Sequence, residues 1–493
     1  MLNKELFLPD GYQAQASVAY FDDAISLENS TVYQPEVYPV AQYLLDGTGR
    51  TRIVDVGCGI GHKLASADAA AKLGIDFGAN IAFCRAHYGD AAEWRECDLS
   101  QPAPADLIQS IGPQDVVICS DVVEHLMDPR PLLDFLGQCF SRGALVITST
   151  PERALVRGAD HVGPPPNPSH IREWTLNEYR ALLNTSGLPP LYIGLTLNND
   201  QNRLLRTIIS VHEPQLQARF AVAATRPLAI ISCFNEADVI VEVIEHWIAE
   251  GCDVHVLDNW STDDSWLLLS RAADRFGDHM VLERFPADRP SEGAWRDILT
   301  RKEEIALTHP GRWIIHSDAD EIRTSPFPLT NLADAMHMSG LAGWNRIGFT
   351  VLNHRPVDDR PFLPGSLQTA LPYFEYGTKP GHFIQLKAWL QGGERVSLVD
   401  SGGHIADFPG TADNPYQFVL HHFPLRSVEH GRRKVNVERR KRWSQEEQAN
   451  GWHNHYAELA GDAALVWPKD RLSDVRDHFW ARHGLQIMMR LQR

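Results

Sequence analysis

The sequence predicts an α/β protein made of two doubly wound domains, and three observations support this fold class. Short apolar, β-rich runs alternate with helix-compatible stretches through the first 150 residues, which is the βαβ pattern of a parallel sheet. The same alternation starts again near residue 228. In each half a glycine-rich or acidic motif directly follows an apolar run, and the carboxyl ends of strands are where open α/β sheets bind ligands.

Length and composition limit the classes of protein that fit. A chain of 493 residues is too long for one hydrophobic core, so roughly two to four domains are expected. The formal net charge of -17 argues against general nucleic-acid binding, because phosphate backbones require a basic protein face. We therefore expect an enzyme that binds small molecules or glycans and no nucleic acid.

The cysteines and the amino terminus bear on the compartment. The seven cysteines lie between Cys58 and Cys252 without metal-ligand spacing, which is typical of buried thiols in a reducing compartment. The first residues lack the apolar core of a signal peptide, and no apolar run reaches membrane-spanning length. We therefore expect a cytoplasmic protein with no transmembrane segment.

The apolar runs give an expected order of elements. In the first half we expect strands at 52–56, 72–75, 115–119 and 144–148 and a closing pair within 198–214. In the second half we expect strands at 228–233, 253–257 and 313–316. The predicted domains are therefore 1–214 and 227–435, with a linker at 215–226 and a helical, basic carboxyl-terminal extension at 436–493.

A glycine-rich turn, Asp55-Val56-Gly57-Cys58-Gly59-Ile60-Gly61, follows the first predicted strand. A dinucleotide fingerprint would place its third glycine at the sixth position, where this chain has His62, so a dehydrogenase is disfavoured. Asp55 could meet the ammonium of a ligand, and Asp76 could accept hydrogen bonds from both hydroxyls of a ribose. Asp98 could receive the exocyclic amine of adenine. Three carboxylates suit cationic S-adenosylmethionine better than an anionic dinucleotide.

Over roughly residues 30 to 212 the chain resembles the class I S-adenosylmethionine-dependent methyltransferases, which have a Rossmann-like fold. The resemblance rests on the glycine-rich turn, Gly74-Ile75-Asp76, Cys97-Asp98 and Ser120-Asp121-Val122-Val123-Glu124-His125-Leu126. It implies a cofactor site made by Asp55, Gly57, Gly59, Gly61, Asp76, Asp98 and Asp121.

Two histidines are candidates for a general base if the acceptor is a hydroxyl. His125 lies in the acidic motif, and His170 begins the segment His170-Ile171-Arg172-Glu173-Trp174-Thr175, which also resembles the small-molecule branch of the family. Methyl transfer needs mainly the alignment of nucleophile and sulfonium, so a purely structural role for either histidine stays open.

Three polar motifs follow the strands predicted in the second half: Ile231-Ser232-Cys233-Phe234-Asn235-Glu236, Asp258-Asn259-Trp260-Ser261-Thr262-Asp263 and Asp318-Ala319-Asp320-Glu321. Two carboxylates two residues apart at a strand end can bridge a hard divalent ion, which neutralises a diphosphate leaving group. The order of the motifs resembles the GT-A glycosyltransferases of the family 2 type, over roughly residues 226 to 435.

That resemblance implies a nucleotide-diphospho-sugar as donor and a divalent ion, manganese or magnesium. Asn235, Glu236 and Asp258 match nucleotide-binding positions, and Asp318 and Asp320 match the metal pair. His422 is the expected third metal ligand and His404 its rival. Inverting members of the family use an acidic base. For that role we select Asp400 over two other carboxylates in the region, Glu375 and Asp407, whereas a retaining enzyme would need no such base.

Eight cations lie between Arg426 and Arg442, against only Glu429 and Glu438. This basic segment could reach a diphosphate, an anionic acceptor or a lipid surface as a peripheral contact, or it could be a solvated helix face. Taken together, the motifs predict a bifunctional methyltransferase and glycosyltransferase that modifies a small molecule or a glycan. The alternative is a glycosyltransferase whose methyltransferase-like half only binds a nucleoside.

Overall fold

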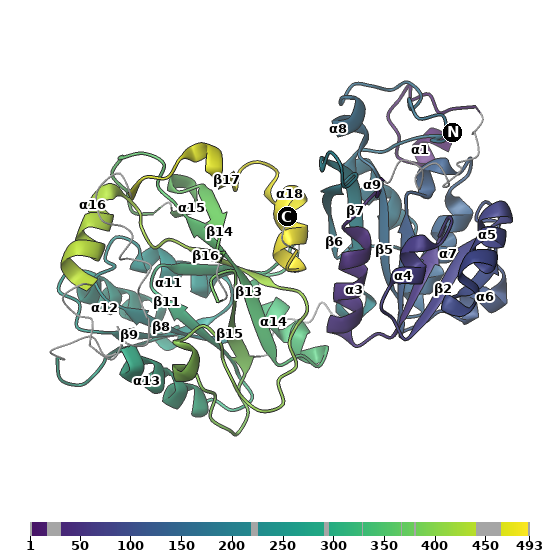
Figure 1. Cartoon of the computed structure of the whole chain (residues 1–493). Coiled ribbons are helices and arrows are strands. Elements are labelled where there is room, and N and C mark those ends of the chain that lie inside the picture. The colour runs from purple at the N-terminus through teal and green to yellow at the C-terminus, as the bar shows by residue number, and fades with distance from the viewer. Residues whose placement is uncertain are drawn as a thin grey trace. The chain divides into compact units, whose positions relative to one another are not determined.

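The structure is a computed structural model of the chain. It describes residues 2–16, 31–217, 225–289, 295–327, 329–365, 367–378, 381–439 and 465–491. The contacts divide the chain into two compact units (Figure 1). The first unit comprises Met1–Arg219 with Trp480–Arg493, and the second comprises Phe220–Phe479.

The first unit contains a seven-stranded sheet in the order β3-β2-β1-β4-β5-β7-β6. Its strands are β1 (Arg52–Val56), β2 (Ala71–Asp76), β3 (Glu93–Glu96), β4 (Asp115–Ser120), β5 (Leu145–Pro151), β6 (Tyr192–Leu197) and β7 (Leu205–His212). Strands β1 to β5 run parallel, and β7 is antiparallel to both β5 and β6. The closing pair of strands therefore begins at Tyr192, before the expected range of 198–214. Its first strand, Tyr192–Leu197, is buried along its whole length.

Helices lie on either side of this sheet (Figure 1). They are α1 (Leu2–Glu5), α3 (Val37–Thr48), α4 (His62–Ser66), α5 (Gly78–Tyr88), α6 (Ala105–Gln109), α7 (Arg130–Ser141), α8 (Arg153–Arg157), α9 (Leu176–Thr185) and α10 (Pro214–Gln217). Valine, leucine and isoleucine from β1, β2, β4 and β5 form one buried cluster with the apolar faces of α7 and α9. Because β2 and β4 lie on opposite sides of β1, the strand order reverses there, and open α/β sheets bind ligands at the carboxyl ends of strands at such a point.

The second unit contains a larger mixed sheet, with the main order β10-β9-β8-β11-β15-β13-β14-β17. Its strands are β8 (Leu228–Cys233), β9 (Asp253–Asp258), β10 (Met280–Arg284), β11 (Trp313–Asp318), β12 (Glu321–Thr324), β13 (Arg346–His354), β14 (Tyr373–Tyr376), β15 (Ile384–Leu390), β16 (Phe418–His422) and β17 (Ser473–Asp474). Strands β8 to β11 run parallel and β15 is antiparallel to β11. The strand order therefore reverses at β8.

The helices of the second unit are α11 (Ile240–Ala249), α12 (Ser265–Phe276), α13 (Trp295–Leu307), α14 (Leu332–Leu341), α15 (Leu367–Ala370) and α16 (Val428–Gly431), followed by a π-helical stretch at Arg432–Arg439. Strand β12 lies off the main path and pairs antiparallel with β16, with Glu321 opposite His422. This pairing brings the histidines of β16 beside the acidic motif, about a hundred residues earlier in the chain.

The carboxyl-terminal part differs from the helical extension expected for 436–493. Strand β17 pairs with β14 at the edge of the second sheet. Helix α18 (Phe479–Met488) follows, and from Trp480 onward it belongs to the first unit, where Gly484 lies against Tyr192 of β6. The difference arises because a two-residue edge strand leaves no periodic signal in the sequence.

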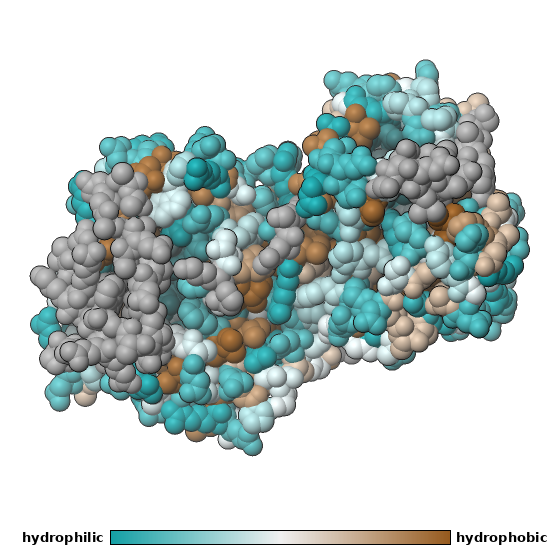
Figure 2. Space-filling view, viewed as in Figure 1, coloured by the Kyte–Doolittle hydropathy of each residue, from teal (hydrophilic) through white to brown (hydrophobic). Residues whose placement is uncertain are grey.

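The face shown in Figure 2 is mainly hydrophilic over the described residues, with apolar residues in separate patches. No helix within the described ranges is both long enough and apolar enough to cross a bilayer.

The packing of Gly61 generates a test of the first unit. Gly61 and Gly49 both have positive φ, at 71° and 69°, but a Cβ at Gly61 would lie 2.6 Å from the Trp94 ring whereas one at Gly49 would meet no atom within 4 Å. We expect Gly61→Ala to destabilise the protein by about 1–3 kcal/mol more than Gly49→Ala, because only the first overpacks the core. Urea unfolding of both variants measures the difference, and equal destabilisation would contradict this account of the turn.

Candidate functional site

The glycine-rich turn after β1 needs glycine for two separate reasons. Gly57, Gly59 and Gly61 all have positive φ, at 81°, 55° and 71°, a region that residues with a Cβ rarely adopt. A Cβ at Gly57 would also lie 2.3 Å from Cγ2 of Val122, in the loop after β4. The turn and that loop therefore pack directly against each other at the point where the strand order reverses.

Neutral donors hold two of the three predicted carboxylates. The Tyr38 hydroxyl on α3 donates to Asp55 at 2.5 Å. Burial is the larger cause, and the negative charge of Asp55 the smaller one, that raises the pKa of Tyr38 well above its ordinary value. The amides of Gly59 and Phe77 donate to Asp76 at 2.8 and 2.7 Å. Asp76 thus ties the glycine-rich turn to the end of β2.

Asp98 follows β3, next to β2 in the sheet, so the three predicted carboxylates lie along one edge. Its side chain is exposed and accepts hydrogen bonds from the amide and the hydroxyl of Ser100, at 2.9 and 2.7 Å. The edge presents exposed Asp98 beside buried Asp76 and Asp55. This arrangement could hold the nucleoside and the amino acid part of S-adenosylmethionine.

The loop after β4 carries a buried polar group that was not predicted as a set. Within the described residues, Glu124, His125 and His170 are the only group of three or more acidic, cysteine or histidine side chains whose ligand atoms all lie within 4.8 Å of one another. The amide of Ile171 donates to the Glu124 carbonyl at 2.7 Å, which brings the two segments together. A carboxylate and two imidazoles are ligands that zinc, manganese and iron accept.

The two histidines are held in fixed orientations. Nδ1 of His125 lies 2.7 Å from the Ser169 carbonyl oxygen, and Nδ1 of His170 lies 2.7 Å from Oε1 of Glu173. Burial lowers the pKa of His125 to about 4, so this imidazole is neutral at physiological pH. A base with so low a pKa removes a proton poorly, which favours a ligand or positioning role over the predicted base role.

Two carboxyl oxygens of the same loop lack a hydrogen bond from the described protein atoms, Oδ1 of Asp121 and Oε1 of Glu124. Asp121 has a positive φ of 54°, which turns the backbone sharply at the end of β4. Burial raises the pKa of Asp121 to about 6 and that of Glu124 well above its ordinary value. A raised pKa makes the ionised Glu124 carboxylate a stronger base than His125, and it also lowers the fraction of Glu124 that is ionised.

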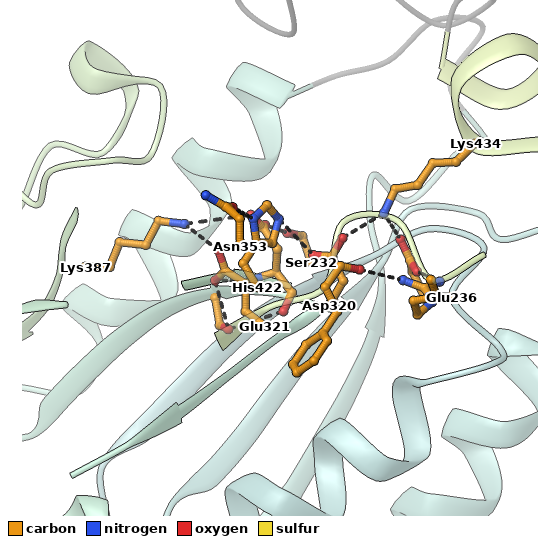
Figure 3. A network of polar contacts seen from close by, with 12 residues as sticks. Ser232, Glu236, Asp320, Glu321, Asn353, Lys387, His422 and Lys434 are labelled. Atoms are coloured by element: carbon orange, nitrogen blue, oxygen red, sulfur yellow. Dashed lines mark hydrogen bonds and ion pairs between the residues drawn. The ribbon is translucent and has the colours of Figure 1, made fainter. Parts of the chain in front are cut away.

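In the second unit the acidic motif lies at the carboxyl end of β11, beside β8. The register places Asp318 opposite Ser232, whose hydroxyl donates to the Asp318 carboxylate at 2.8 Å. Glu321 accepts from Lys387 at 3.0 Å and from Arg323 at 2.8 Å, and Lys387 also lies 3.8 Å from Asp318 (Figure 3). Cations are thus built into the acidic edge.

Asp320 points to the other side of this network, where Lys434 donates to its carboxylate at 2.7 Å (Figure 3). The same ammonium donates to Glu236 at 2.9 Å, and Arg426 donates to the second oxygen of Glu236 at 2.5 Å. Burial alone would raise the pKa of both acids, but it is outweighed by the cations. The pKa of Glu236 falls to about 2, and that of Asp320 also falls.

Asp318, Asp320 and His422 do not meet as a ligand set within the described residues. Nε2 of His422 lies 3.9 Å from Asp320, and its Nδ1 lies 2.9 Å from Oδ1 of Asn353. The rival His404 is half-buried, and burial lowers its pKa to about 4. The metal assignment stays a prediction that this geometry does not favour.

The other predicted residues of the second unit lie in separate places. Asn235 has a positive φ of 55°, and its Oδ1 accepts from the Thr262 amide at 2.7 Å, which joins the loops after β8 and β9. Asp258 is buried at the end of β9, 3.6 Å from Arg284. Asp400 lies exposed in the 3-10 turn Val399–Ser401 and accepts from the Ser397 hydroxyl at 2.7 Å. Its role as a base stays a prediction.

Several residues of these networks were not predicted. Lys302 on α13 is buried and donates to Ser232 at 3.1 Å and to the Ser317 carbonyl at 2.7 Å, and burial lowers its pKa to about 7. Lys387 and Tyr38 contact the motifs from distant elements. A sequence signal existed for Lys434 and for Arg426, because both lie in the basic segment.

The first unit matches a family model described as a methyltransferase domain, over residues 34–200. The chain is 34% identical over 133 residues to a ubiquinone biosynthesis O-methyltransferase of Caulobacter sp. (strain K31). It is 30% identical over 120 residues to the protein of the same name from Cronobacter sakazakii (strain ATCC BAA-894). These matches cover 24% and 22% of this chain and 49% of each relative, so the chain spans about half the length of these curated relatives.

Solved structures of methyltransferases are more distant. The 1,6-didemethyltoxoflavin-N1-methyltransferase of Burkholderia thailandensis is 15% identical, with a TM-score of 0.30, over 39% of this chain and 82% of that one. An S-adenosylmethionine dependent methyltransferase from Mesorhizobium loti is 18% identical, with a TM-score of 0.26, over 36% and 96%. At these scores the structural likeness adds nothing to the assignment. The family match, the parallel sheet and the glycine-rich turn assign the amino-terminal region to the class I S-adenosylmethionine-dependent methyltransferase domains.

Proposed function

We propose that the first unit transfers a methyl group from S-adenosylmethionine to an oxygen of a small-molecule or glycan acceptor. The observation that carries this proposal is the Asp76 carboxylate, which accepts a hydrogen bond from the Gly59 amide at the carboxyl end of β2, inside the matched range. The two curated relatives, both named O-methyltransferases, support oxygen as the acceptor atom. When bound, S-adenosylmethionine supplies the methyl group on a positively charged sulfonium.

Different residues of this proposed site would bind the cofactor and the acceptor. Asp55 and Asp76 hold negative charge next to the turn and would attract and orient the cationic cofactor. Gly57 and Gly61 keep the turn in place, because their missing side chains let Val122 and Trp94 pack against it. Glu124, His125 and His170 would hold either the acceptor hydroxyl or a divalent ion beside it, and the ionised form of Glu124 would take the proton of the hydroxyl.

The second unit favours a second activity, glycosyl transfer from a nucleotide-diphospho-sugar. The observation that favours it is Asp318 at the carboxyl end of β11, beside β8, where the order of the parallel strands reverses. Asn235 and Glu236 follow β8, and Asp258 is the last residue of β9, at the same edge. These polar groups at one sheet edge support the proposal, although Asp318, Asp320 and His422 do not gather as a metal set among the described residues.

Covalent fusion of the two units suggests that they act in sequence on one product. Labelled S-adenosylmethionine would be given to the purified protein with candidate acceptors before and after glycosylation. A preference for one form supports sequential action, whereas equal methylation of both forms contradicts it. Cofactor binding without methyl transfer to any acceptor in a cell extract would instead indicate a silent nucleoside-binding module.

All seven cysteines are free, which fits the reducing compartment expected from the sequence, and we propose a cytoplasmic location. Fractionation of the native host with an antibody against the chain tests this proposal directly.

The role of Asp76 can be tested with a substitution that keeps its shape. Asp76→Asn removes the charge that two backbone amides and the cofactor share, so we expect S-adenosylhomocysteine to bind about tenfold to a hundredfold more weakly. Methyl transfer should fall with it. Isothermal titration measures the binding, with Asp68→Asn, an exposed aspartate of the same unit, as the matched control. Unchanged affinity in Asp76→Asn would refute the assigned site.

The role of Asp318 can be separated from the methyltransferase. We expect Asp318→Asn to reduce release of nucleoside diphosphate from the preferred sugar donor by about a hundredfold, because the carboxylate organises the polar groups at the strand end. Methyl transfer should not change. The assay uses a panel of uridine, guanosine and thymidine diphospho-sugars, with exposed Asp359→Asn as control. If the unsubstituted protein turns over no donor, the proposed glycosyl transfer fails.

A further inference from the structure

We propose that Lys434 is the resident cation of the acidic edge in the second unit and holds the place at Asp320 where the GT-A resemblance implies a divalent ion. The inference rests on the proposed glycosyl transfer for its bearing on a sugar donor, but not for the cation site itself. It makes donor use by this unit independent of a metal at Asp320.

The contacts of Lys434 are those of a counter-ion and not of a surface lysine. Its ammonium lies 2.7 Å from Asp320 and 2.9 Å from Glu236, and its side chain is 3% exposed. It therefore bridges two carboxylates that follow different strands, β11 and β8 (Figure 3). A bridging position between carboxylates at a strand end is also what a metal ion of this kind would occupy.

The protein already supplies most of the counter-charge of the edge, with four cations beside five carboxylates. Its five carboxylates each have a cationic side chain nearby: Asp238 and Glu236 pair with Arg426, Glu236 and Asp320 with Lys434, Glu321 with Arg323, and Asp318 and Glu321 with Lys387. A divalent ion would bring two further positive charges to a buried region whose carboxylates are paired. Burying such an excess is costly, so the ion could bind only by displacing a cation.

Among the described residues, the side chains expected to complete a metal shell also do not gather around one point. Nδ1 of His422 is held by the Asn353 side chain at 2.9 Å, so only its Nε2, 3.9 Å from Asp320, is directed toward the acidic motif. The ligand atoms of Asp318, Asp320 and His422 do not gather as a set in the part of the chain that the structure describes. The residues present thus do not fit the divalent ion.

The local fold explains how a lysine so far along the chain reaches this edge. Ser427 caps α16, with its hydroxyl accepting from the His430 amide at 3.1 Å, and the helical turns continue through Lys434. Arg426, immediately before the cap, is buried against Glu236 and Asp238. Arg426 and Lys434 therefore clamp the basic segment onto the acidic edge, while Arg432 and Arg433 between them are exposed.

The experiment counts Mn²⁺ sites with no sugar donor present. Unbound Mn²⁺ is measured by electron paramagnetic resonance during titration of the full chain, the Asp320→Asn variant, the Lys434→Met variant and the double variant. We expect the natural chain and Asp320→Asn to bind the same number of ions, so that a site at Glu124, His125 and His170 cancels in the comparison. We expect Lys434→Met to bind one further ion, which the double variant loses. Arg432→Met, on the same turn, should gain none.

The proposal is overturned if Asp320→Asn removes an Mn²⁺ site from the natural chain, or if a folded Lys434→Met variant gains no site. Thermal unfolding shows whether that variant folds. If it does not, the comparison of the natural chain with Asp320→Asn still decides, and Lys434→Arg should match the natural chain because it keeps the cation. Absence of sugar transfer with every donor would end the proposed glycosyl transfer without changing these metal counts.

Discussion

Buried carboxylates at the carboxyl ends of parallel strands are the constraint on which both units depend. A carboxylate removed from water must be hydrogen-bonded or paired, or it loses its charge. In the first unit, hydroxyl and amide groups hold Asp55 and Asp76. In the second unit, ammonium and guanidinium groups hold Glu236, Asp320 and Glu321. Neutral donors leave the negative charge in place, whereas cations cancel it, so the two edges suit different ligands.

This difference between the two edges suits the ligand that is proposed for each of them. A sulfonium brings its own positive charge, and an acidic edge held by dipoles attracts it without competition. A sugar nucleotide is an anion, and an uncompensated acidic edge would repel it. The lysines and arginines of the second unit remove that repulsion, which a bound metal ion would otherwise have to do. The same sheet geometry can therefore favour a cationic or an anionic ligand, depending on whether neutral donors or cations hold its carboxylates.

The local parts of the structure could be predicted from the sequence, and the long-range parts could not. The run Arg52–Val56 and the glycines after it define β1 and its turn. They could be predicted because the spacing of apolar residues and the preference of glycine for positive φ depend only on residues close together in the chain. Pairing of β12 with β16 and the approach of Lys434 to Asp320 join segments about a hundred residues apart, and no local pattern encodes them. Glu124 was part of a recognised motif, but its grouping with His170 required the fold.

The basic segment shows how folding changes the meaning of a charge pattern. As a sequence, the cations of 426–442 suggest a diphosphate, an anionic acceptor, a lipid surface or a solvated helix face. In the structure, Arg426 and Lys434 are buried against acids and contribute no field to a membrane. Residues 440–442 lie outside the described ranges, so contact with a lipid surface stays a prediction that rests on fewer charges. A run of cations in an acidic protein can be an internal counter-ion, because the acids it neutralises are far away only along the chain.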